Sequence, residues 1–216
     1  MRTILYSHGW LEHKYFGCRV NWLKFYREIQ KELDIDIIYL ADNASSLEDL
    51  DKLEKSDDFI IHRFDTRITR PSFFDYNYHA RAVFHMRDVI LKYDPERIIL
   101  CEHDFYLLNS KIINYIKSST SGIEVFYCHK YGFPESGLFI INRDSYPAFL
   151  EYTKGDWKDM YLNLQFENVF PFTKINKDFV GDRYGEGDQP QTEAMDYYSQ
   201  ANTPSRKLIF NYKESK

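Results

Sequence analysis

Short apolar runs alternate with amphipathic segments in the first half of the chain, and this alternation limits the fold more than any other feature. Runs with the length of buried strands lie at 3–6, 35–40 and 58–62. Segments in which apolar residues recur with a helical period lie at 21–33 and 77–92. Strands that alternate with helices at this spacing form a parallel sheet with right-handed crossovers. We therefore expect an α/β fold with a mixed, mainly parallel central sheet flanked by helices.

The second half of the chain follows a less regular pattern. Helices are expected at 109–116, 146–152 and 192–199, and further strands at 123–128 and 137–141. Asp144 is expected to cap the helix over 146–152, and Ser46, with Asp49 three residues later, to cap a short helix in the first half. Residues 157–179 lose any clean period, which predicts irregular structure.

A fourth apolar run, 98–101, breaks abruptly into Glu102, His103 and Asp104. Open α/β sheets bind ligands beyond the carboxyl ends of their strands. On an extended chain Glu102 and Asp104 point the same way, and a carboxylate pair there suits Mg²⁺ or Mn²⁺, which in turn hold phosphates. Acids that are merely solvated at a strand end explain the tripeptide equally well.

Composition argues against several classes of partner. With a formal net charge of -5 and no basic run, the chain is not expected to bind nucleic acid. Its three cysteines lack zinc-site spacing and are expected to be buried, reduced thiols. The N-terminal apolar run at 4–6 is too short for a signal peptide or a membrane span. We therefore expect no membrane insertion and a cytoplasmic location, in the host cytoplasm if the chain is viral.

Several familiar catalytic motifs are absent from the sequence, namely GxxxxGK[ST], a strand-linked GxGxxG, GxSxG and HExxH. Hydrolase and dehydrogenase functions thereby lose their strongest support. Two further stretches stand out beside 102–104. They are a Glu135-Ser136-Gly137 turn before a strand and a glycine-rich, acidic loop at 181–189.

In this order, the segments EHD (102–104), GFPESGLFIINRD (132–144) and GEGDQ (185–189) resemble three motifs of the GT-A class of nucleotide-sugar glycosyltransferases. The first resembles the DxD motif with Glu in the first place. The second resembles the Asn-Ser-Gly turn of the class, and the third the Gly-Asp-Gln segment of its glycogenin-like branch. The resemblance covers nearly the whole chain, which is also similar in size to the small glycosyltransferase domains of large algal viruses.

The resemblance implies a single GT-A-like domain over 1–216, with a Rossmann-like donor-binding half at about 1–109 and an acceptor-binding, catalytic half at about 110–216. It implies transfer of a hexose or deoxyhexose from a UDP-sugar, UDP-glucose first, to a glycan or glycoprotein acceptor. Mn²⁺, or Mg²⁺, would bind at Asp104 and Glu102, and Glu102 ligates it either directly or through water. The late histidine ligand of the glycogenin-like branch has no counterpart, because no histidine follows His129.

The resemblance also implies donor contacts, mostly on loops that follow the strands. The residues concerned are Ser7, His8, Gly9, Asp42, Arg63, Arg81, Glu102, His103, Glu135, Ser136, Gly137 and Gln189. Asp42 resembles the residue that reads the uracil edge, and Arg81 is placed to clamp a diphosphate. A turn-forming aspartate and a solvated helix arginine are the alternatives. Ser136 and Gly137 suit a close approach of backbone to sugar, and a plain tight turn explains them almost as well.

Asp188, in the GEGDQ segment, is the candidate base that takes the proton of the acceptor hydroxyl. An acid among glycines lies in a loop where a buried ligand raises its pKa. In a retaining enzyme its role becomes positioning or electrostatic stabilisation. A structural aspartate that caps the following helix is the alternative.

Two other functions are compatible with the sequence. A sugar-nucleotide pyrophosphorylase uses the same kind of sheet, but it needs a glycine-rich, basic loop after the first strand, and 7–11 holds one glycine. A non-catalytic carbohydrate-binding module would use the aromatic residues, 18% of the chain, as stacking platforms. Residues 208–216 suit either a closing lid or a continuation into a further domain of a longer natural chain.

Overall fold

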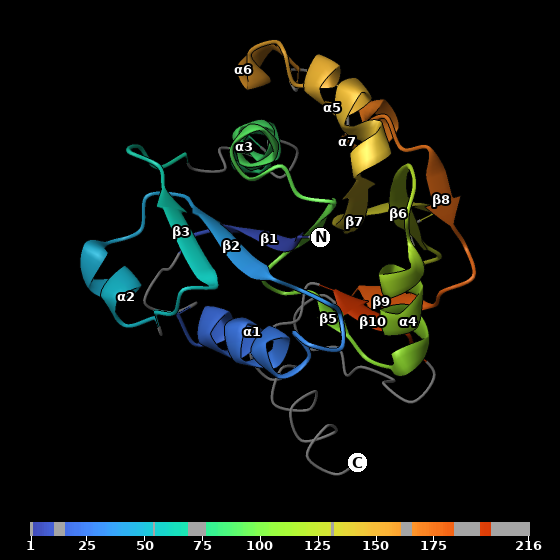
Figure 1. Ribbon diagram of the computed structural model, residues 1–216, viewed down its shortest axis with the longest axis horizontal. Coiled ribbons are helices and arrows are strands. Elements are labelled where there is room, and N and C mark those ends of the chain that lie inside the picture. The colour runs from blue at the N-terminus through green and yellow to red at the C-terminus, as the bar shows by residue number, and fades with distance from the viewer. Residues whose placement is uncertain are drawn as a thin grey trace.

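The computed structural model describes residues 2–10, 16–53, 55–68, 77–130, 132–160, 166–183 and 195–199. Its centre is a seven-stranded sheet in the order β3-β2-β1-β4-β7-β6-β8 (Figure 1). The strands are β1 (Thr3–Gly9), β2 (Ile37–Asp42), β3 (Phe59–Arg63), β4 (Arg97–Cys101), β6 (Ile123–Cys128), β7 (Phe133–Asn142) and β8 (Lys174–Asn176). Because β7 runs antiparallel to β4 and β6 while the other pairings are parallel, the mixed, mainly parallel sheet is confirmed.

β1 and β4 lie at the centre of the sheet, and every residue of both strands is buried. Parallel strands that are covered on both faces are continuous apolar runs rather than alternating patterns, as Ile98-Ile99-Leu100 illustrates. In the register of the sheet, Tyr6 lies opposite Leu100 on one side and Tyr39 on the other. This register brings the carboxyl ends of β1, β2 and β4 to the same edge.

Helices and a small second sheet cover the two faces of the central sheet (Figure 1). One face carries α1 (Phe16–Glu28), α4 (Ser110–Ser118) and the three-stranded sheet of β5 (Tyr106–Leu107), β10 (Tyr197–Ser199) and β9 (Gly181–Arg183). The other carries α3 (Asn77–Tyr93), α5 (Tyr146–Tyr152), α6 (Trp157–Met160) and α7 (Phe166–Val169). The short α2 (Leu47–Asp51) lies between β2 and β3 in the chain, and Ser46 caps it as predicted. Each face buries its own apolar cluster.

The structure corrects the predicted helix over 192–199. Residues 197–199 form strand β10, which pairs with β5 and β9. Tyr197 and Tyr198 are fully buried, and the ring of Tyr197 stacks on Phe105 with 5.0 Å between ring centroids. Burial of two successive side chains against a distant strand overrides a weak local helical preference.

Three smaller predictions also differ from the structure. The first helix begins at Phe16 rather than at 21 and ends at Glu28. The region 157–179, expected to be irregular, contains α6, α7 and β8. Asp144 does not cap α5. Its carboxylate instead accepts the backbone N–H of Gly122 at 2.9 Å, and residues Arg143–Ser145 form a 3-10 turn before the helix.

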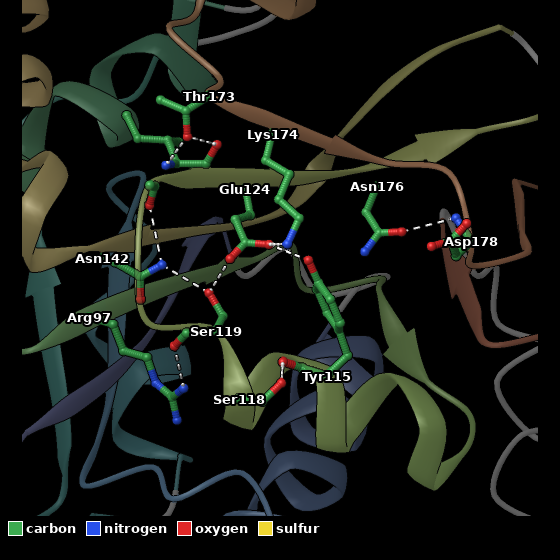
Figure 2. A network of polar contacts seen from close by, with 12 residues as sticks. Arg97, Tyr115, Ser118, Ser119, Glu124, Asn142, Thr173, Lys174, Asn176 and Asp178 are labelled. Carbon is green, nitrogen blue, oxygen red and sulfur yellow. Dashed lines mark hydrogen bonds and ion pairs between the residues drawn. The ribbon is translucent and has the colours of Figure 1, made fainter.

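A network of polar contacts joins α4 to β6 and β8 (Figure 2). Its centre is the buried carboxylate of Glu124, which accepts hydrogen bonds from Tyr115 and, at 2.6 Å, from Ser119, and pairs with Lys174 at 2.9 Å. Burial alone would raise the pKa of Glu124, but these donors hold the pKa below its ordinary value. A buried charge is tolerated here because hydrogen bonds and a cation compensate it.

Two further sequence predictions concern cysteines and membranes. Cys101 and Cys128 are buried free thiols, as expected, and the side chain of Cys18 lies outside what the structure describes. Burial raises the pKa of Cys101 to about 12, which makes this thiol inert at neutral pH. Among the helices that the structure describes, none combines the length and the apolar character needed to cross a bilayer.

Candidate functional site

The carboxyl edge of the central sheet gathers polar residues that are distant in the sequence. His8 and Gly9 end β1, and Glu102 follows β4, its parallel neighbour. Gly9 has a φ of +140°, and a Cβ there would lie 1.6 Å from Nη2 of Arg19 and 3.3 Å from Nδ1 of His103. Only glycine allows the backbone to pass this closely beside the two side chains.

Glu102, His103 and Asp104 lie in a turn and not on an extended strand. β4 ends at Cys101, and the N–H of Phe105 closes the turn by donating to the carbonyl of Glu102 at 3.0 Å. The side chains of Glu102 and Asp104 are therefore not oriented by the two-residue period of a strand. Both side chains still lie just beyond the carboxyl end of β4, partly buried.

Glu102 lies with two histidines in a compact cluster. Nε2 of His8 is 2.9 Å from Nδ1 of His79, and Oε1 of Glu102 is 3.7 Å from the first of these atoms and 3.4 Å from the second. His8 and His79 are 2% and 4% exposed, and the Glu102 side chain is 19% exposed. Two imidazole nitrogens and one carboxylate oxygen at these distances can hold a divalent cation.

Sequence reasoning predicted His8 and Glu102 but missed His79. This histidine lies in the first turn of α3, which runs from β3 back to β4. A helix that connects two parallel strands runs against them, so its first turn lies at the carboxyl edge of the sheet. A polar residue in the first turn of such a helix therefore indicates a position at the carboxyl edge, and this could have been inferred from the sequence.

Arg19 in α1 is the second residue that sequence reasoning missed, and the same rule applies to it. Arg19 is 3% exposed, and its Nη2 donates to the carbonyl of His8 at 3.0 Å. Nε and Nη1 have no hydrogen-bond partner among the described residues. Burial lowers the pKa of Arg19 to about 10, while Asp42, Asp104 and Glu102 favour its charged form, so Arg19 stays cationic at neutral pH.

The electrostatics of the edge keep His8 and His103 neutral. Burial, and then the neighbouring His79, hold the pKa of His8 well below its usual value. Burial, followed by the charge of Arg19, lowers the pKa of His103 to about 3. Neutral imidazoles retain a lone pair, which is the form that binds metal ions.

Three of the predicted donor residues, Asp42 at the end of β2, Arg63 at the end of β3 and Arg81 in α3, contact the loop after β2, so each already has a partner. Asp42 is fully buried and accepts both the N–H, at 2.7 Å, and the hydroxyl of Ser45. Arg63 donates to the carbonyl of Ser45 at 2.7 Å. Arg81 donates to the carbonyl of Thr66 at 2.7 Å and to the side chain of Asn43. These contacts shape the loop, and contacts of the three residues with a donor stay predictions.

Glu135, Ser136 and Gly137 lie inside β7 and not in a turn before it. Gly137 pairs with the acidic turn, because its carbonyl accepts the N–H of Glu102 at 2.8 Å. A Cβ on Gly137 would lie 3.2 Å from Oε2 of Glu102 and 3.4 Å from Oε1 of Glu135. A larger residue at this position would therefore be crowded by the Glu102 carboxylate, which would have to shift by a few tenths of an ångström. Ser136 donates to Glu167 at 2.6 Å.

Ser7 is fully buried in β1, one residue before the cluster. Asp188 and Gln189 lie outside the residues that the structure describes, so the base and the second loop stay predictions from sequence.

Comparison with known proteins starts from the sequence. No protein-family model matches it, and no curated protein is significantly similar to it. Solved structures do match. A glycosyltransferase involved in the glycosylation of the major capsid of PBCV-1 is 11% identical and aligns over 99% of this chain and 100% of its own, with a TM-score of 0.55. The galactosyltransferase LgtC, in complex with donor and acceptor sugar analogues, is 8% identical and aligns over 99% and 95%, with a TM-score of 0.60.

The chain has the GT-A fold. The bifunctional glycosyltransferase WbbM is also similar, with 8% identity, a TM-score of 0.60 and 49% of its own length covered. At such identities the likeness establishes the GT-A fold, and the chemistry must be argued from the residues at the carboxyl edge.

Proposed function

We propose that this protein is a metal-dependent glycosyltransferase that moves a hexose or deoxyhexose from a UDP-sugar to a glycan or glycoprotein acceptor. UDP-glucose is the first donor to test, and Mn²⁺ or Mg²⁺ the cation. One observation carries the proposal. At the carboxyl edge of a GT-A sheet, metal-ligating side chains converge with a buried, incompletely hydrogen-bonded arginine.

Arg19 supports the binding of an anionic donor. A buried N–H without a partner costs free energy, and a phosphate oxygen would remove that cost through a charge-assisted hydrogen bond. Arg19 is held by Gly9 and His8 and stays protonated at neutral pH. In the proposal it receives the diphosphate at the edge where β1 and β4 end.

The acids at the same edge support the binding of a cation. A bound divalent ion would act as a Lewis acid on the leaving diphosphate. Glu102 and Asp104 are the proposed carboxylate ligands, and both lie close enough to Arg19 to interact with its charge, so in the proposal the cation and the diphosphate bind side by side. Asp42 is proposed to select uracil, and Asp188 to take the proton of the acceptor hydroxyl.

The donor site is tested by calorimetric titration of UDP with Mn²⁺ present. Because hydrogen bonds to charged groups contribute about 1.5–3 kcal/mol, Arg19→Met should weaken UDP binding by roughly 10- to 100-fold. Asp104→Asn should abolish its Mn²⁺ dependence. Arg27→Met is the matched control, because Arg27 lies at the other end of α1 and pairs with Asp58 at 2.6 Å. It should leave UDP affinity unchanged.

The proposal is wrong if Arg19→Met and Asp104→Asn both bind UDP as the wild type does. If Arg19→Met does not fold, Arg19→Lys, which keeps the charge, replaces it in the UDP titration. Donor hydrolysis, followed by mass spectrometry over UDP-, GDP- and CMP-sugars with and without Mn²⁺, tests the reaction. A pyrophosphorylase would instead consume pyrophosphate, and a carbohydrate-binding module would bind sugar without nucleotide or metal.

A further inference from the structure

We propose that His8, His79 and Glu102 form a nitrogen-rich metal site that binds Zn²⁺ and Co²⁺ more tightly than Mn²⁺, and Mg²⁺ only weakly. The site shares Glu102 with the acid pair. Its other two protein ligands are histidines. In the site implied by the resemblance, Asp104, phosphate oxygens and water would be the other ligands. The site lies at the same edge as the proposed donor site, but it requires neither nucleotide nor sugar.

The geometry of the cluster fits a single ion. The three ligand atoms are separated by 2.9, 3.4 and 3.7 Å. Bonds from zinc to imidazole nitrogen and carboxylate oxygen are about 2.0–2.2 Å, which in a tetrahedral site separates the ligand atoms by about 3.3–3.6 Å. The observed separations bracket this range, so one ion fits with only small side-chain movements.

A hydrogen bond between the two histidines is the alternative to a metal site. In that interpretation one ring donates to the other at 2.9 Å. Oε1 of Glu102 is then 3.4 and 3.7 Å from the two nitrogens, beyond the 2.7–3.2 Å usual for an N–H donor. A cation between the three atoms would bind all of them at once.

The surrounding fold holds the ligands in place. They come from β1, from the first turn of α3 and from the turn after β4. β1 and β4 are paired, and the hydroxyl of Tyr6 donates to the carbonyl of Ala82 at 2.6 Å, which ties α3 to β1 near His79. Ligands on fixed elements lose little conformational freedom when an ion binds.

The local charge also favours a cation. Three carboxylates at this edge, those of Asp42, Asp104 and Glu102, interact with Arg19. Arg19 opposes metal binding, whereas the carboxylates favour it. A partly exposed Glu102 leaves a side open for further ligands.

The donor set decides which ions bind. Imidazole suits zinc, copper, nickel and iron, and affinity rises from Mn²⁺ through Co²⁺ in the usual order for divalent ions. Mg²⁺ prefers oxygen ligands in near-ideal octahedral geometry. Two nitrogens and one oxygen therefore favour Zn²⁺ and Co²⁺ strongly over Mg²⁺.

The test is a titration of metal-free protein with Co²⁺, followed by visible absorption, and with Zn²⁺, followed by calorimetry, both without nucleotide. We expect one ion per chain and no competition by Mg²⁺. Loss of a residue that only orients a metal ligand lowers metal affinity by about 10- to 100-fold. Loss of a ligand itself, in His79→Gln, should therefore weaken binding by more than about tenfold. Asp104→Asn should retain it. His129→Gln is the matched control, because His129 is exposed and bonds to the Lys177 carbonyl.

Equal Co²⁺ affinity in His79→Gln and wild type overturns the assignment, and so does loss of binding in Asp104→Asn alone. If the variants misfold, the electron paramagnetic resonance spectrum of the Cu²⁺-loaded wild type tests the site instead. Coupling to imidazole nitrogen supports the site, and its absence overturns it. If the wild type binds the metal ion but not UDP, the proposed donor site is refuted and the metal site is still supported.

Discussion

His85, in α3, is a largely buried titratable residue away from the candidate site. Nδ1 lies 3.1 Å from Asp88 and Nε2 lies 3.0 Å from the hydroxyl of Tyr39, and the ring stacks on His62 with 3.9 Å between centroids. Burial, followed by the neighbouring His62, lowers the pKa of His85 to about 4. The folded protein thus keeps this ring neutral where the unfolded chain would protonate it.

Acid should therefore destabilise the protein through His85. The unfolded state binds the extra proton below about pH 6.5, so this contribution to the free energy of unfolding is complete above that pH and is lost as the pH falls toward about 4. The loss is at most roughly 3 kcal/mol. Urea unfolding at pH 7 and pH 4.5 measures it. In His85→Gln, which keeps a polar partner for Tyr39, the decline should be smaller, and an equal decline in both proteins would contradict the assignment.

At the residue scale, sequence predicted that acids follow β4 and that His8 lies at the end of β1, but it predicted neither the turn over 102–104 nor the whole candidate site. Glu102 and His8 follow apolar runs, so their position at a strand end could be inferred. His79 and Arg19 lie in amphipathic helices, where a polar residue usually faces solvent. Their placement at the carboxyl edge depends on the direction of each crossover helix, which becomes evident only once the strands are paired.

At the element scale, Asn109 connects α4 to the small second sheet. Its side-chain oxygen caps the helix by accepting the N–H of Ile112 at 3.2 Å. Its amide nitrogen donates to the carboxylate of Asp196 at 2.9 Å and to the carbonyl of Met195 at 3.2 Å, just before β10. One side chain thus stabilises a helix end and positions a distant strand.

Asn109→Ala should lower the free energy of unfolding by about 2 kcal/mol, of which about 1 comes from the cap and about 1 from the link to Asp196. Asn109→Ser keeps a cap acceptor and should lose only the second part. Ser46→Ala is the matched control, since Ser46 caps α2 on the exposed surface through the N–H of Asp49. Urea denaturation compares the three, and a loss in Asn109→Ala no larger than in Ser46→Ala would refute the linking role.

Long elements could be predicted from sequence, and short ones could not. The apolar runs of β1, β2, β3, β4 and β6 and the period of α3 all gave elements near the expected positions. β5, β8, β9 and β10 have two or three residues each, too few to show a period. They exist because they pair with partners far along the chain, as Tyr198 does with Tyr106.

At the scale of the whole molecule, Arg97 ties several segments together at the amino edge of the sheet. Its buried guanidinium donates to the carbonyls of Ile116 and Lys117, both at 2.8 Å, to that of Leu33 at 3.3 Å and to the hydroxyl of Thr3 at 3.2 Å. It lines a cavity of about 570 Å³ at the end of β4 opposite to Glu102.

Arg97→Met should lower the free energy of unfolding by roughly 3 kcal/mol or more, because it leaves several buried carbonyls without donors. Folded Arg97→Met should bind UDP and Co²⁺ as the wild type does, since the altered residue lies at the other end of β4. Arg143→Met is the control at the same edge. Arg143 is partly exposed and pairs with Asp94 at 2.9 Å, so its loss should cost within about 1 kcal/mol. Chemical denaturation of both variants decides whether Arg97 has this role.

The central position of β1 also has a consequence for the protein's synthesis. Among the strands of this sheet β1 is made first, and one of its neighbours, β4, pairs Arg97 with Thr3 across roughly 90 residues of chain. At a translation rate of about 5–20 residues per second, roughly 5–20 s pass before β4 can follow. During that interval one side of an apolar strand has no partner, and an open strand edge can pair with other chains. Slow translation between β3 and β4 would therefore prolong the period in which the nascent chain depends on chaperones.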